Sequence, residues 1–333
     1  MAVVLFAFLG WLVVSIASSL VLSQSLDKIG ARFGLSPGTL GFVTALGADA
    51  PEIAAVVSAI AAGHHDLGMG VIFGSNIFNL AGLLGLGAVL AGRVSIGRQG
   101  MILEGLVALV ATSIGIAVTL DALSGTFGLV ALGVLLLAFQ VLMSLRPGVW
   151  KWLSIFGVDP ARFMVEAAAE AEHAAREEYT PPRATGTDVL TLVPAIVAIV
   201  VASFGMVRLA VDLAGHFHWP HVVIGALVLA TLTGIPNVLA AVRLAIHGRG
   251  SAVVSETLNS NSVNILAGIC LPAVVVGTHV PTTLAVVSAW WLLAMTAVAV
   301  VLSCRRGGLA RLGGASLMVV YGAYVVLVCA WRS

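Results

Sequence analysis

The amino-acid sequence predicts an all-α polytopic membrane protein, with ten transmembrane helices arranged as two inverted five-helix repeats. Three observations predict this fold class: an apolar composition, apolar segments of membrane-spanning length throughout the chain, and a polar motif that occurs twice. Of the 333 residues, 60% are hydrophobic and 9% are charged. So few charged side chains cannot cover the surface of a water-soluble globule, and that class is excluded.

Ten apolar segments of about 20 residues are each long enough to cross a hydrocarbon layer of about 30 Å. The first has no basic stretch before its apolar core, so we expect no cleaved signal peptide. The cysteines lie in apolar segments and indicate neither a disulfide framework nor a metal cluster. The predicted spans are residues 2–24, 38–62, 67–91, 99–120, 123–144, 189–214, 221–246, 252–277, 281–303 and 310–331.

Lysine and arginine concentrate in alternate loops between these spans, near residues 28–32, 93–98, 146–183, 243–249 and 305–311. By the positive-inside rule these loops face the cytoplasm, which places the amino terminus outside. We therefore expect an integral protein of the plasma (cell) membrane.

The longest polar stretch, residues 146–188, divides the predicted spans five and five. It contains "DPARFMVEAAAEAEHAAREEY", which is typical of a short, solvated acidic helix opened by Asp-Pro. We expect a cytoplasmic linker here, between a first repeat at residues 1–145 and a second repeat at residues 189–333.

A polar motif occurs once in each half. The stretch "ALGADAPE" (45–52) returns as "TLTGIPN" (231–237), and "GSNIFN" (74–79) returns as "NSNSVN" (259–264). Each helix that carries a copy lies five spans from its counterpart, an odd number, so the second copy crosses the membrane in the opposite direction. Inverted repeats of this kind form substrate sites near the bilayer midplane. One offset of 185 residues takes Pro51 to Pro236, Glu52 to Asn237, Asn76 to Asn261 and Asn79 to Asn264.

These motifs resemble the two alpha-repeats of the sodium/calcium exchanger superfamily, the first over residues 41–92 and the second over residues 225–277. The preceding stretch, "LDKIGARFGLSPGTLGFVTALG", is similar to that family's lead-in to its first repeat. The resemblance implies secondary-active antiport of Ca²⁺ and/or Na⁺ by alternating access, with helices one and six sliding across a rigid core. It implies no resident cofactor, since the cations are cargo.

The prolines and amides of the motif predict a cation site at mid-membrane. Pro51 and Pro236 each remove a backbone donor inside a predicted helix, and we expect a break there. Carbonyl and carboxylate oxygens are the hard ligands that Ca²⁺ prefers. Asn76 and Asn261 lie about ten residues into their predicted helices, and therefore about 15 Å deep.

Glu52 is the residue that we most expect to bind the cation, because an intramembrane carboxylate is costly and indicates function. Asp49 lies three residues before it. The resembled family usually has a hydroxyl at position 49 and a second Glu where this chain has Asn237. Our hypothesis is that Asp49 replaces the carboxylate lost at Asn237. Further candidate ligands are Asn76, Asn237 and Asn261 and the hydroxyls of Ser75, Thr233, Thr257 and Ser260.

Several alternatives stay open at this point. Two close carboxylates seldom both stay ionised when desolvated, so the Asp49–Glu52 pair also fits Na⁺/H⁺ or Ca²⁺/H⁺ exchange. The polar residues could instead make only structural interhelical bonds, or the scaffold could serve a channel or a non-exchanging sensor.

Other function classes are not expected. The sequence has no His-Glu-x-x-His motif and no nucleophile–base pair at membrane depth, so we expect no enzyme. Neither an ATP-binding motif nor a nucleic-acid signature is present in it. The expected partners are inorganic cations and the lipid bilayer, and the sequence makes no prediction about oligomeric state.

Overall fold

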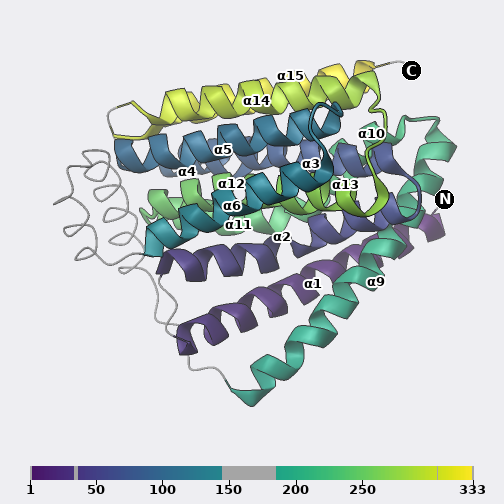
Figure 1. Cartoon of the computed structure of the whole chain (residues 1–333), viewed down its shortest axis with the longest axis horizontal. Helices are drawn as coiled ribbons and strands as arrows, with labels where there is room; N and C mark the ends of the chain where they lie inside the picture. The colour runs from purple at the N-terminus through teal and green to yellow at the C-terminus, as the bar shows by residue number, and fades with distance from the viewer. Residues whose placement is uncertain (1, 34–36, 145–184, 306, 332–333) are drawn as a thin grey trace.

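The computed structural model describes residues 2–33, 37–144, 185–305 and 307–331 of the chain (Figure 1). Most of the predicted cytoplasmic linker, residues 146–184, lies outside the described residues. Most of the described chain is helical, and it also contains one pair of two-residue strands.

The first half begins with two long helices and continues with a helix that changes type along its length. A two-residue strand then precedes two further helices. The elements are α1 (Ala2–Arg32), α2 (Pro37–Ala61), α3 (His65–Asn79), the π-helix η1 (Leu80–Leu86), α4 (Gly87–Ala91), β1 (Arg93–Val94), α5 (Arg98–Thr119) and α6 (Gly125–Ser144).

The second half has a similar order, and its strand pairs with that of the first half. β1 and β2 are antiparallel, with Arg93 opposite Ala310 and Val94 opposite Leu309. The elements are α9 (Gly186–Phe217), α10 (His221–Val223), the π-helix η2 (Ile224–Leu229), α11 (Ala230–Ile246), α12 (Gly250–Ile265), the π-helix η3 (Leu266–Cys270), α13 (Leu271–Val276), α14 (Thr283–Ser303), β2 (Leu309–Ala310) and α15 (Arg311–Ala330).

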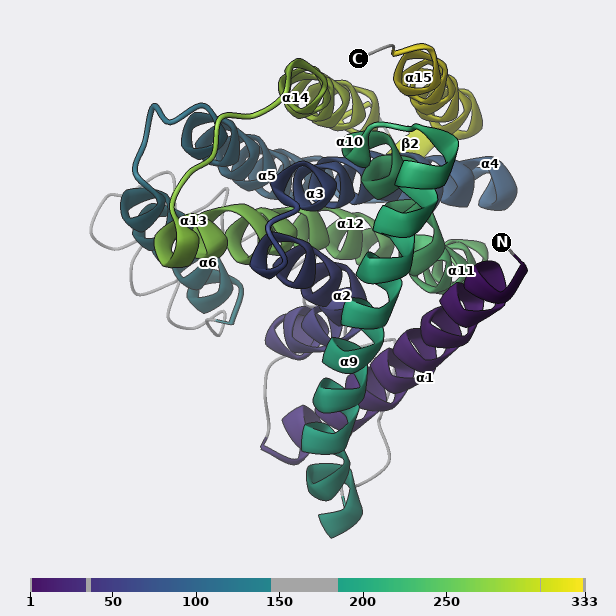
Figure 2. The same ribbon diagram turned by 90° about the vertical axis from the view of Figure 1, so that its right-hand side faces the viewer.

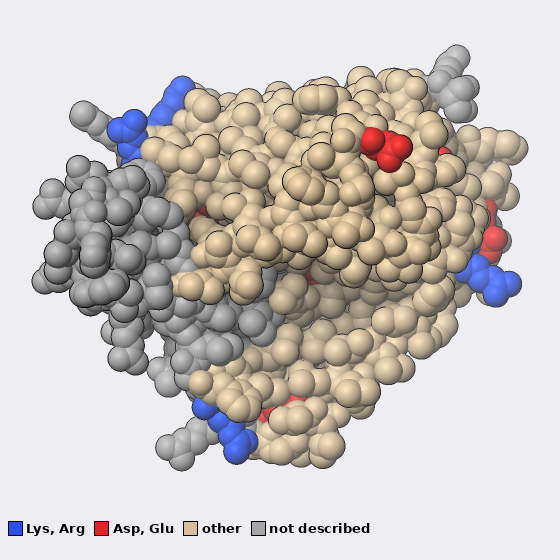
Figure 3. All heavy atoms as spheres, in the orientation of Figure 1, with Lys and Arg blue, Asp and Glu red and all other residues tan. Residues whose placement is uncertain are grey.

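Eight of the helical segments are long and apolar enough to cross a membrane. The other two predicted spans correspond to α2, which is not among the eight, and to α6, whose apolar part at residues 125–141 is shorter. On the face shown in Figure 3, uncharged residues cover the middle, and Lys and Arg lie toward the left and right ends. The structure therefore confirms a helical, polytopic membrane protein, while the count of ten spans stays a prediction.

The helices form a packed centre with two peripheral pairs. In both views α14 and α15 lie on one side, α1 and α9 lie on the other, and α2, α3, α11 and α12 lie between them (Figures 1 and 2). In the most apolar part of the segment at residues 65–91, 83% of the residues are buried, against 22% in α1 and 28% in α9. The centre is therefore shielded by protein, whereas α1 and α9 mostly face outward.

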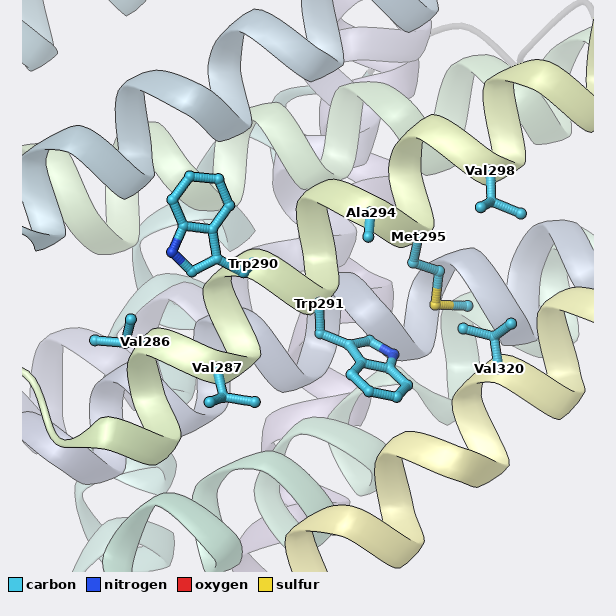
Figure 4. Close-up of a pocket in the computed structure, with 8 residues that line it drawn as sticks. All are labelled: Val286, Val287, Trp290, Trp291, Ala294, Met295, Val298 and Val320. Carbon is cyan, nitrogen blue, oxygen red and sulfur yellow. The ribbon is translucent and has the colours of Figure 1, made fainter.

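A groove between α14 and α15 lies on the opposite side of the molecule from α1, away from the centre (Figure 4). It has a volume of about 430 Å³ and contains Trp290, Trp291 and Met295 of α14 and Val320 of α15. Its side chains are apolar, as expected for a surface in contact with lipid tails.

The predicted helix breaks at Pro51 and Pro236 are wrong. Both prolines lie inside continuous helices, α2 and α11. The physical reason is visible at Pro51, where Ser19 of α1 donates a hydrogen bond to the Gly47 carbonyl, one turn before the proline. A neighbouring hydroxyl can thus serve a carbonyl that proline leaves without its helical donor. The irregular backbone lies elsewhere: η1 directly follows Asn79, and η3 begins two residues after Asn264.

Glycines of α3 allow the centre to pack closely. A Cβ atom built on Gly74 would lie 2.5 Å from the Cα atom of Ala226 in η2. Gly70, one turn earlier, faces the carbonyl of Val222 in the same way. Small residues four apart let membrane helices approach to backbone contact, and here they bring α3 against α10 and η2.

We expect Gly74→Ala to destabilise the protein by about 1–3 kcal/mol, because the added methyl overpacks this crossing. The matched control is Gly133→Ala in α6, where a Cβ atom meets nothing within 4 Å. Thermal unfolding of the purified variants in detergent would compare them. Equal melting temperatures for the two variants would contradict the proposed close packing.

Candidate cation site

Polar residues of both motifs lie together in the packed centre, on four helices. The carboxylates are on α2, and amides and hydroxyls come from α3, α11 and α12. None of these side chains is more than 6% exposed, so this polar cluster is sealed from water in the present conformation. Its members are Asp49, Glu52, Ser75, Asn76, Asn79, Thr233, Asn237, Thr257, Ser260, Asn261 and Asn264.

Asn76 and Asn261 form a reciprocal pair at the centre of the polar cluster. The Asn76 Nδ2 atom donates to the Asn261 carbonyl at 3.2 Å, and the Asn261 Nδ2 atom donates to the Asn76 carbonyl at 3.1 Å. Each is the twelfth residue of its helix, counted from His65 in α3 and from Gly250 in α12. The 185-residue offset therefore brings equivalent side chains into direct contact.

A second pair of bonds follows the same relation. Asn79 Nδ2 donates to Asn261 Oδ1 at 3.4 Å, and Asn264 Nδ2 donates to Asn76 Oδ1 at 3.1 Å. Exchanging each residue for its counterpart 185 positions away turns one bond into the other. The contacts between α3 and α12 thus have a local two-fold relation.

The two carboxylates contact different halves of the second motif. Glu52 Oε2 accepts a hydrogen bond from Asn264 Nδ2 at 3.0 Å. Asp49 Oδ1 accepts one from Asn237 Nδ2, also at 3.0 Å. Asn237 is the counterpart of Glu52, so the Asp49 carboxylate lies beside the position where the second motif lacks its acid.

Gly234, the counterpart of Asp49, leaves space for Glu52. A Cβ atom on Gly234 would lie 3.3 Å from Glu52 Oε1 and 2.9 Å from the ring of Phe78. The chain therefore has an acid at both positions of the first motif and none at either position of the second. Asp49 therefore lies beside Asn237, the counterpart of Glu52, and Glu52 lies beside Gly234, the counterpart of Asp49.

Four oxygen atoms in the polar cluster are buried and accept no hydrogen bond from the described residues: Asp49 Oδ2, Glu52 Oε1, Asn79 Oδ1 and Asn264 Oδ1. The amide orientation of Asn264 is fixed by its hydrogen bonds, since its Nδ2 atom donates to two oxygens. A buried acceptor without a partner is costly. Carboxylate and amide oxygens together are a donor set that fits a hard cation such as Na⁺ or Ca²⁺.

The hydroxyls predicted as ligands differ in what they contact. Ser260 Oγ accepts from Asn79 Nδ2 at 3.2 Å, which places it within the amide network. Ser75, Thr233 and Thr257 donate to carbonyls of their own helices, namely Ile72, Leu229 and Val253. The protons of Thr233 and Thr257 are therefore directed to the backbone, whereas the Ser75 hydroxyl also lies close to the Glu52 carboxylate.

The sequence reasoning did not include Asn79 and Asn264 among the candidate ligands. The signal that could have identified them was available, because both follow the central asparagines by three residues and recur at the same offset. Residues three apart share a helix face, so an asparagine at that spacing faces the same neighbour.

Comparisons with known proteins agree with the fold. The family model described as "Sodium/calcium exchanger protein" matches residues 2–154 and 187–330. A protein named "Putative antiporter CaxA" from Alkalimonas amylolytica is 25% identical over 307 residues, covering 91% of each chain. "Inner membrane protein YrbG" from Escherichia coli strain K12 is 28% identical over 276 residues, covering 79% of this chain and 77% of that protein.

Two solved structures have the same fold. The sodium-calcium exchanger NCX_Mj, soaked with 10 mM Na⁺ and 10 mM Sr²⁺, aligns with a TM-score of 0.62 at 19% identity and covers 100% of both chains. Native YfkE aligns with a TM-score of 0.62 at 14% identity, covering 96% of this chain and 91% of that chain.

Proposed function

We propose that this chain, which belongs to the sodium/calcium exchanger family, exchanges Ca²⁺ and/or Na⁺ by alternating access. The exchange would take place at the polar cluster of α2, α3, α11 and α12. The proposal includes ten spans in two inverted repeats, an outward amino terminus and a cytoplasmic 146–188 linker. It also places the protein in the plasma membrane. The coarser statement, that the chain is a cation antiporter of a membrane, follows from its family and fold.

The four buried oxygens without partners are the observation that carries the proposal. They belong to two carboxylates and two amides, and they come from α2, α3 and α12. Leaving them unpaired is costly, and carboxylate and amide oxygens of this kind are satisfied by coordinating a hard cation. The local two-fold relation of Asn76 and Asn261 supports the inverted repeat, in which substrate sites form between the halves.

Proton-coupled exchange of Na⁺ or Ca²⁺ is the second candidate, and the two neighbouring acids favour it. Within the described part of the chain, the recorded ion pair is Lys28–Asp188, and no basic side chain pairs with Asp49 or Glu52. Two buried negative charges without a basic partner are very unfavourable. A bound cation or a bound proton would each relieve that cost, so the two ions would compete for the same oxygens.

Isotope flux into proteoliposomes tests the proposal. Uptake of ⁴⁵Ca²⁺ and of ²²Na⁺ would be measured under an imposed Na⁺ gradient and, separately, under an imposed pH gradient. Uptake driven by the Na⁺ gradient is expected for Na⁺/Ca²⁺ exchange, and uptake driven by the pH gradient is expected for the proton-coupled alternative. Uptake that carries current without any counter-transport would identify a channel and would contradict antiport.

A further inference from the structure

The Gly47 carbonyl of α2 depends on another helix for its hydrogen bond. Pro51 has no backbone N–H, so the carbonyl four residues earlier loses its helical donor. The Ser19 hydroxyl of α1 donates to that oxygen at 2.8 Å and lies 3.2 Å from the carbonyl oxygen of Ala48. Ser19 is 6% exposed, so water does not compete for the bond.

The opposite end of the same turn contacts α9. The Ser203 hydroxyl donates to the Pro51 carbonyl at 3.5 Å, a longer and weaker contact than that of Ser19. Hydroxyls from α1 and α9 therefore meet residues 47–51 of α2. That turn contains Asp49 and ends one residue before Glu52.

At Gly47 the contact between α1 and α2 involves the backbones themselves. A Cβ atom on Gly47 would lie 2.9 Å from the Cα atom of Ser23. Any side chain here would separate the helices and lengthen the Ser19 bond. The missing side chain and the hydroxyl thus act together to hold α1 against the proline turn.

The C-terminal part of α1 is joined to the N-terminal part of α9. Lys28 Nζ lies 2.9 Å from Asp188 Oδ1, and the hydroxyls of Ser25 and Thr191 lie 3.1 Å apart. Figure 2 shows α9 crossing in front of α2, with α1 beside the lower part of α9. Most residues of both helices lie outside the packed centre, and both helices pack against α2.

We propose that Ser19 is a positioning residue that couples the position of α1 to the geometry of Asp49 and Glu52. The inference rests on the proposed function, since it concerns the same cation site. A displacement of α1 would remove the donor from the Gly47 carbonyl and would free the turn that holds both acids. The cation would then meet a less ordered set of oxygens, so the position of α1 sets the affinity for the cation.

Three variants test the coupling. Ser19→Ala removes the hydroxyl, and Ser19→Thr restores one. The matched control is Ser15→Ala, which lies one turn earlier on α1, is fully buried, and has a hydroxyl without a partner in the described structure. Amide hydrogen exchange of residues 46–55 would be measured by mass spectrometry on the full chain in nanodiscs, together with the ⁴⁵Ca²⁺ or ²²Na⁺ concentration that gives half-maximal flux.

We expect Ser19→Ala to increase amide exchange in this turn by about 3- to 10-fold, as for the loss of one net hydrogen bond. The half-maximal cation concentration should rise by a similar factor while the maximal rate changes less. Ser15→Ala should leave both quantities within about twofold of the wild type, and Ser19→Thr should restore them.

Equal effects of Ser19→Ala and Ser15→Ala on amide exchange, or no effect of Ser19→Ala, would overturn the inference. Exchange at the turn is measured without transport, so this result is independent of the proposed function. Failure of the proposed function would instead appear as cation flux that does not require Glu52.

Discussion

Glu52→Gln is expected to reduce cation exchange by more than about 100-fold while the protein still folds. The amide keeps the size of the side chain but removes one of two negative charges from a fully buried cluster. With a cation bound, Glu52 is one partner of a buried pair of opposite charges, and removing one partner of such a pair costs on the order of 3–5 kcal/mol. Initial rates of ⁴⁵Ca²⁺ and ²²Na⁺ uptake into proteoliposomes would measure the loss.

Glu104→Gln is the matched control for this prediction. Glu104 of α5 is 3% exposed and accepts a hydrogen bond from Ser255 of α12 at 2.6 Å, so it is a buried glutamate outside the polar cluster. We expect the control to retain uptake within about threefold of the wild type, since a neutral amide also accepts a hydrogen bond from a hydroxyl. Full exchange by Glu52→Gln, or an equal loss in both variants, would show that Glu52 has no special role.

Moving the second acid across the cluster is the other change with a large expected effect. Asp49→Asn should lower exchange by about 30-fold or more, because one charge is lost, as at Glu52. The double variant Asp49→Asn with Asn237→Glu should exchange cations at least about tenfold faster than Asp49→Asn alone. The two side chains are in direct contact at 3.0 Å, so the carboxylate returns to nearly the same place.

Exchange rates and half-maximal cation concentrations of the wild type, both single variants and the double variant would form a complete cycle. The pair is coupled if Asn237→Glu raises the exchange rate more in the Asp49→Asn background than in the wild type. If the double variant is no better than Asp49→Asn, Asp49 does not act in place of the acid that Asn237 lacks. Asn237→Glu alone adds a third acid and serves as the control for the size of the new side chain.

Much of the fold and of the cluster could be predicted from the sequence, because the same polar spacing occurs twice. The offset placed Asn76 and Asn261 at a similar depth in their helices, the structure brings them into contact, and the family match confirms the resemblance. The roles of the predicted ligands stay predictions. The helix breaks at Pro51 and Pro236 were wrong because proline chemistry within one helix does not reveal a donor on a neighbour, such as Ser19 of α1.

The contact between Asp49 and Asn237 could be suspected from charge but not located from the sequence. It depends on how α2 and α11 cross, and that crossing depends in part on the space left by Gly234. Asn79 and Asn264 were missed although their spacing and their offset are visible in the sequence. Only the structure shows that the Oδ1 atom of each stays unpaired, because that depends on donors from other helices.

Anomalous diffraction from crystals soaked with Sr²⁺ or Tl⁺, as stand-ins for divalent and monovalent cations, would test the cation site most directly. We predict a peak within about 2.3–2.8 Å of the free oxygens of Asp49, Glu52, Asn79 and Asn264. The same peak should be absent from crystals of Glu52→Gln. A saturating soak that leaves these four oxygens without a peak, or that places the cation outside the polar cluster, would contradict the account.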